Sequence, residues 1–97
     1  MTNVYREVQL HLAELTIGQL KYVGEVDTGW SIDDRATIVI DTLRRPTFSN
    51  LAELFGLIVE HCGDQDQATV EIGSDCVVFS GIEIKPKVTV EVFGHGV

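Results

Sequence analysis

Catalytic and cofactor motifs are missing from this chain of 97 residues. It has no glycine-rich phosphate loop and no nucleophile elbow. It also lacks the paired short spacings of cysteine and histidine that hold a structural zinc ion. We therefore expect no cofactor and no bound metal, and the sequence by itself names no activity.

Cysteines and long apolar runs are also scarce. Cys62 and Cys76 are far fewer than a small secreted scaffold needs, so we expect two thiols, with a single disulfide between them as the open alternative. No apolar run approaches the length of about 18 residues that suggests a membrane span, and the first residues lack the basic-then-apolar pattern of a secretory signal, with a leader already removed as the open alternative. We expect one domain over residues 1–97, in the cytoplasm and without membrane contact.

Positive charge is the third scarcity. The chain has 15 acidic residues against seven lysines and arginines, a formal net charge of −8, and residues 47–84 contain no lysine or arginine. Direct nucleic-acid binding needs a basic patch, so we do not expect it. A basic protein partner would be attracted to such a chain, while solvated acids kept for solubility are the simpler alternative.

An amphipathic helix after residue 50 is the clearest element. Asn50 is expected as its N-cap, Glu53 as the reciprocal capping-box residue and Gly63 as the glycine that ends it. Leu57 is expected at the flank of the apolar stripe. The stripe recurs with a helical period at Leu51, Leu54, Phe55, Ile58, Val59 and Cys62.

Strand patterns surround this helix. Residues 4–15 alternate through Val8, Leu10 and Leu12, as a half-exposed strand does. Residues 20–26 are expected as a second strand, although Thr16 and Gln19 would also start a short helix. Residues 27–34 are expected as a loop, and residues 36–43 as the central strand because apolar side chains fall on both faces.

The second half predicts a hairpin and a further strand. Residues 68–72 and 76–79 are expected to pair through a tight turn at residues 73–75. Ser80 and Gly81 are expected to break the strand, after which alternation continues to residue 92 around Pro86, a residue typical of an edge or a bulge. Residues 94–97 are expected to be frayed.

These patterns predict a single α+β domain, with a largely antiparallel sheet of about five or six strands and one amphipathic helix packed across one face. One helix leaves the other face of the sheet uncovered. We therefore expect a protein partner, and self-association into a homodimer or a larger oligomer.

Two groups of residues are candidate sites. The anion-binding candidates are Arg44 and Arg45, which precede the helix N-terminus, with ordinary surface ion pairs as the alternative. Acids at Asp27, Asp33 and Asp34 match no calcium loop and are expected to be solvated. The partner-binding candidates are Glu53, Leu57, Glu60, Asp64, Asp66 and Trp30.

The leading functional hypothesis is a small non-catalytic protein that binds another protein, or serves as an assembly subunit, through an acidic face or an open sheet. The first alternative is an acidic inhibitor that mimics nucleic-acid phosphates and blocks a basic nucleic-acid-binding protein. The second is a small enzyme whose site has no sequence signature, since catalytic triads are recognised by geometry. Burial of Cys62 on the apolar stripe would make that thiol inert.

Overall fold

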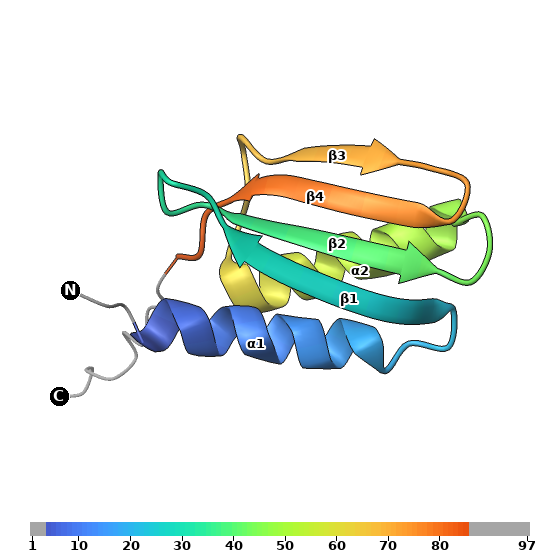
Figure 1. Cartoon of the computed structure of the whole chain (residues 1–97), viewed down its shortest axis with the longest axis horizontal. Helices are drawn as coiled ribbons and strands as arrows, with labels where there is room; N and C mark the ends of the chain where they lie inside the picture. Colours follow the sequence, from blue (N-terminus) through green and yellow to red (C-terminus); the bar gives the residue numbers. More distant parts are fainter. Residues whose placement is uncertain (1–3, 86–97) are drawn as a thin grey trace, which may run out of the picture.

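The computed structural model describes residues 4–85 and has two layers, a four-stranded antiparallel sheet and two helices that cover one of its faces (Figure 1). The elements are α1 (Val4–Gly18), β1 (Val23–Trp30), β2 (Ala36–Thr42), α2 (Phe48–Cys62), β3 (Thr69–Ile72) and β4 (Cys76–Ile82). The strands lie in the order β1-β2-β4-β3. The predicted α+β class and antiparallel sheet are confirmed, whereas five or six strands with a single helix is wrong for residues 4–85. The strand pattern and frayed end expected after residue 85 lie outside the described residues.

Helix α1 occupies the segment where the sequence predicts a strand. Its buried residues are Gln9, Leu10, Ala13 and Ile17, which repeat with the helical period rather than in alternation. The Thr16 hydroxyl donates to the Leu12 carbonyl at 2.8 Å inside this helix and starts no new one. The second predicted strand begins only at residue 23, and the loop expected over residues 27–34 is reduced to residues 31–35 because β1 extends to residue 30.

Helix α2 confirms the predicted amphipathic helix but begins three residues earlier. Thr47 is the N-cap, and its side chain accepts a hydrogen bond of 3.1 Å from the Asn50 amide. The Asn50 side chain accepts one of 3.1 Å from the Thr47 amide, so Asn50 completes the capping box from within the first turn. Gly63 ends the helix with a φ of 95°, a value that favours glycine.

Strand β2 is central, as predicted, because it pairs with β1 on one side and with β4 on the other. The predicted hairpin is also confirmed, and the Gly73 amide donates to the Cys76 carbonyl at 2.7 Å across its turn. The break expected at Ser80 and Gly81 is instead a bulge within β4. Gly81 has a φ of 72° there, and the β2–β4 register shifts opposite it, so the strand continues to residue 82.

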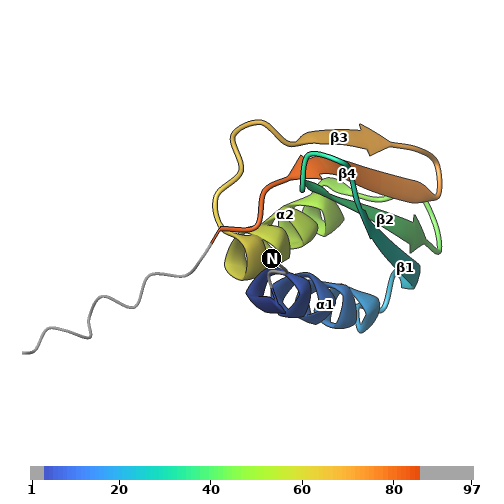
Figure 2. The same cartoon turned by 60° about the vertical axis from the view of Figure 1, so that its left-hand side comes forward.

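The core lies between the sheet and the two helices. Ile38 and Ile40 of β2 are fully buried against this layer, and alternation therefore directs Thr37, Val39 and Asp41 to the opposite face. Figure 2 shows both helices on the same side of the sheet. No described element covers the other face of the sheet, so that face is available to a partner.

Candidate functional site

The open sheet face consists of the strand side chains that point away from the helices. Its middle row, read across the strands, pairs Asp27 with Val39, Val39 with Val78, and Val78 with Glu71. The neighbouring row pairs Glu25 with Asp41 and Asp41 with Cys76. We define the open sheet face by its central and charged members, Glu25, Asp27, Val39, Asp41, Glu71, Cys76 and Val78.

Two valines form the centre of the open sheet face, and acids lie on either side of them and at one end. Val39 is 37% exposed and Val78 is half-buried, while the four acids Glu25, Asp27, Asp41 and Glu71 are exposed. None of the four strands contains a lysine or an arginine. The face therefore combines a small apolar centre with a rim of uncompensated negative charge.

Arg35 lies just before β2, at one end of the open sheet face. Its Nη1 donates to the Gly81 carbonyl at 3.3 Å and is 3.9 Å from Glu83 Oε1. Its Nε is 3.8 Å from Asp33 Oδ2. The Arg35 guanidinium therefore pairs with two acids outside the strands, and it does not neutralise the acids of the strands.

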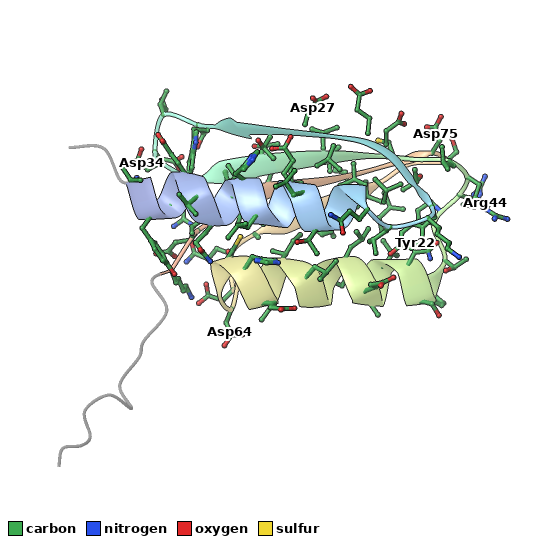
Figure 3. The ribbon with its side chains drawn as sticks, turned by 90° about the horizontal axis from the view of Figure 1, so that it is seen from below. Tyr22, Asp27, Asp34, Arg44, Asp64 and Asp75 are labelled. Carbon is green, nitrogen blue, oxygen red and sulfur yellow. The ribbon has the colours of Figure 1, made fainter. Side chains whose placement is uncertain are left out.

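The predicted partner-binding acids of α2 form a separate surface. Glu53, Leu57 and Glu60 recur along one side of α2, and Asp64 and Asp66 lie in the connection that follows it. Glu53 accepts a hydrogen bond of 2.9 Å from the Tyr22 hydroxyl, and Leu57 is half-buried against the core. Glu60, Asp64 and Asp66 are exposed. Figure 3 shows Asp64 and Asp27 projecting from opposite sides of the molecule, so the two acidic surfaces are distinct.

Trp30 lies apart from the α2 acids. It is the last residue of β1 and pairs with buried Ala36, which directs its ring to the helix side of the sheet. The Arg6 guanidinium of α1 sits over this ring, 5.3 Å from the centroid, and also contacts Asp34 at 3.4 Å. Trp30 thus joins β1 to α1, and the predicted partner-binding set is not brought together into one surface.

The two arginines predicted to bind an anion line different depressions. Arg44 shares one of about 310 Å³ with Lys21, Tyr22, Thr47 and Asn50 at the N-terminus of α2. Figure 3 shows Arg44 and Tyr22 at the same end of the molecule. Arg45 lines another depression, with Phe48 and Ile72 among its neighbours. The two depressions share Thr47, and the anion-binding role of Arg44 and Arg45 stays a prediction.

Titratable groups with shifted pKa values are dispersed. Burial, followed by the hydrogen bond to Glu53 and the charge of that carboxylate, raises the pKa of Tyr22 above its usual range. The Ser31 hydroxyl, which donates to Asp33, is the main cause that lowers the pKa of Asp33. Burial raises the pKa of the Cys62 thiol to about 11. Tyr22, Asp33 and Cys62 lie in different parts of the fold.

Residues 4–85 contain two free thiols and no cluster of possible metal ligands. Cys62 is a buried free thiol, and Cys76 is a half-buried free thiol on the open sheet face. Across these residues, no group of three or more histidine, cysteine and acidic side chains is arranged to hold a metal ion. Neither described helix combines the length and apolar character that crossing a bilayer requires.

Comparison of the chain with protein-family models, with curated proteins and with solved structures found no match. The features of the fold are therefore the basis for a functional proposal.

Sequence reasoning missed the acids of the open sheet face. Glu25 and Asp27 of β1 share a face with Asp41 of β2 and Glu71 of β3 only because the strands pair in the order β1-β2-β4-β3. One signal was present, since Asp41 alternates with buried Ile40 and Thr42 in the central strand. The same alternation could not reveal which strands lie beside β2.

Proposed function

We propose that this protein is a small non-catalytic binding module that holds a basic protein partner on its open sheet face. The observation that carries the proposal is the pair of valines, Val39 and Val78, at the centre of a helix-free face whose charged strand residues are all acidic. An apolar centre inside a polar rim is the usual anatomy of a protein interface. The same chemistry suits a role as a subunit that recruits a basic component.

Electrostatics favours a basic partner over a neutral one. A formal net charge of −8 attracts cationic surfaces at a distance, and the acids of the open sheet face then set the docking position. Each close pair of exposed charges contributes at most about 1 kcal/mol, so several pairs and the valine contact must act together. Affinity is therefore expected to fall as salt screens the charges.

A cytoplasmic location belongs to the same proposal. The free thiol of Cys76 suits a reducing compartment, because a half-buried thiol is open to oxidation outside it. An inhibitor that imitates nucleic-acid phosphates is the narrower form of this function. It would use the same carboxylates against a basic nucleic-acid-binding protein. The contacts within residues 4–85 are the same for this narrower function and for the general one.

The proposal is tested with a fluorescent synthetic peptide of alternating lysine and valine, whose extended form offers charge and apolar contact together. One variant combines Asp27→Asn, Asp41→Asn and Glu71→Gln on the open sheet face. We expect its dissociation constant to rise at least about tenfold, the equivalent of about 1.4 kcal/mol. The binding of the unaltered protein should weaken as salt rises from about 0.1 M to about 1 M.

The control has the same loss of charge elsewhere. It combines Glu60→Gln, Asp64→Asn and Asp66→Asn, all exposed on or just after α2. We expect it to change the dissociation constant by less than about threefold, because only the long-range attraction is reduced. Equal weakening by both variants would mean that the peptide follows net charge alone, which would overturn the open sheet face as the binding site.

A further inference from the structure

Strand β3 ends the sheet beside β4 and has an unpaired outer edge among the described residues. The Gly73 amide bonds to the Cys76 carbonyl, so alternation along an antiparallel pair assigns the backbone groups of Glu71 and Thr69 to β4. The amides and carbonyls of Val70 and Ile72 are therefore directed outward. They offer hydrogen bonds to another strand.

An uncharged apolar groove adjoins this edge on the helix side of the sheet. It encloses about 240 Å³, and its lining from α2, β3 and β4 contains no charged side chain. Phe55 and Val59 of α2 are 44% and 41% exposed there, and Val70 of β3 is 36% exposed. We call the surface formed by Phe55, Val59 and Val70 the β3 groove.

The opposite edge of the sheet is protected, and this contrast makes the β3 edge notable. β1 has a register shift between Val23 and Glu25, and it contains two acids, Glu25 and Asp27. Helix α1 also packs along β1 (Figure 1). Bulges, charges and covering helices are the devices that prevent a strand edge from pairing. β3 has only one acid, Glu71, and no bulge.

We propose that the β3 edge and the β3 groove bind a second copy of this chain. The two β3 strands would pair antiparallel about a two-fold axis at Val70, which joins the two sheets into one continuous sheet. Phe55 and Val59 of each copy would then cover the paired strands from the helix side. A symmetric contact of this kind buries the same surface on both copies.

Charge selects a second copy over a basic partner for this surface. Each chain has a formal net charge of −8, so two copies can meet only where acids are sparse, and the groove lining is uncharged. A basic partner would gain no ion pair inside that lining. Two acidic chains can therefore share the groove without bringing carboxylates together inside it.

The register about Val70 follows from the side chains of β3. Two pairing registers keep the same faces of both sheets together and pair most residues of the two β3 strands. One register is centred on Val70 and the other on Glu71. Centring on Glu71 would place two carboxylates directly opposite each other, which is destabilising. Centring on Val70 places Thr69 opposite Glu71 and makes Val70 a hydrogen-bonded pair with its own copy.

This pairing leaves the open sheet face uncovered. A two-fold axis between paired edges runs perpendicular to the sheet, so both open faces would lie on the same side of the joined sheet. The dimer therefore goes beyond the proposed partner binding and does not depend on it. Its failure would be seen in the mass of the protein alone, without any peptide probe.

The test is light scattering coupled to size exclusion on the full chain, with Val70→Lys as the variant and Val39→Lys as the control. Val70 and Val39 are matched strand valines, 36% and 37% exposed, on opposite faces of the sheet. We expect twice the chain mass for the wild type and for Val39→Lys, and one chain mass for Val70→Lys. The wild-type dimer should persist or tighten at about 1 M salt, since salt screens the repulsion of two acidic chains.

A cysteine pair checks the register. In a Cys76→Ser background, Val70→Cys should form a disulfide-linked dimer in glutathione disulfide, because paired α-carbons lie about 5.5 Å apart. Ile72→Cys should not, because its copy would be several residues away. Circular dichroism of each variant shows whether it has folded, and the cysteine variants test the dimer without adding charge.

Three results would overturn the dimer. One is a monomeric wild type at millimolar concentration, and another is a dimer lost in Val39→Lys but kept in Val70→Lys. The third combines two findings, in which Val90→Lys abolishes the dimer and Val70→Cys forms no disulfide. Together they would assign the β3 groove to the C-terminal segment of the chain instead of to β3 of a second copy.

Discussion

Cys62 shows how one buried side chain links the fold to pH. It is fully buried at the end of α2, and burial raises the pKa of its thiol to about 11, because the thiolate cannot be solvated there. A cysteine in the unfolded chain titrates near about 8.5. Between these two values the unfolded chain loses a proton that the folded chain keeps.

The free energy of unfolding should therefore fall as pH rises above about 8.5, because the unfolded state binds fewer protons there than the folded state. We expect a loss of about 1 to 2 kcal/mol from this thiol by about pH 10. Below about pH 8.5 this thiol does not lower the free energy of unfolding, because it is protonated in both states. Urea unfolding at a series of pH values measures the slope, and Cys62→Ala should remove most of it. An unchanged slope in Cys62→Ala would show that this thiol is not the cause.

At the scale of elements, α2 was predictable because several signals agreed. Its apolar stripe runs over four turns, and Gly63 marks its end. α1 was not predictable in the same way. Leu10 fits both a strand that includes Val8 and Leu12 and a helix that includes Ala13 and Ile17, and only packing against α2 and β1 selects the helix.

The attachment of α2 to the sheet is tested at Leu54, which is fully buried in the core. Leu54→Ala should reduce the free energy of unfolding by about 2 to 5 kcal/mol, because it removes apolar contacts and leaves a cavity. Glu60→Ala on the same helix is the control. Its side chain is exposed, so the change should stay within about 0.5 kcal/mol. A loss below that value for Leu54→Ala would contradict the packing of α2.

At the scale of the whole molecule, the arrangement of charge decides more than its total. From the formal net charge of −8, the sequence alone offers a basic partner as one interpretation, and it points to acids on and just after α2, such as Glu60 and Asp64. The fold adds a second surface, where Asp27 and Asp41 flank Val39 across two paired strands. That arrangement depends on strand order and on both helices covering one face, which residue patterns do not encode locally.

The most direct test of the open sheet face is a map of backbone amide shifts. The isotope-labelled full chain is titrated with the peptide of alternating lysine and valine, and amide resonances are followed by nuclear magnetic resonance. We expect the largest shifts at β2 and β4, with Val39, Asp41 and Val78 among them, and small shifts along the outer side of α2. Shifts centred on Glu60, Asp64 and Asp66 instead would contradict binding at the open sheet face.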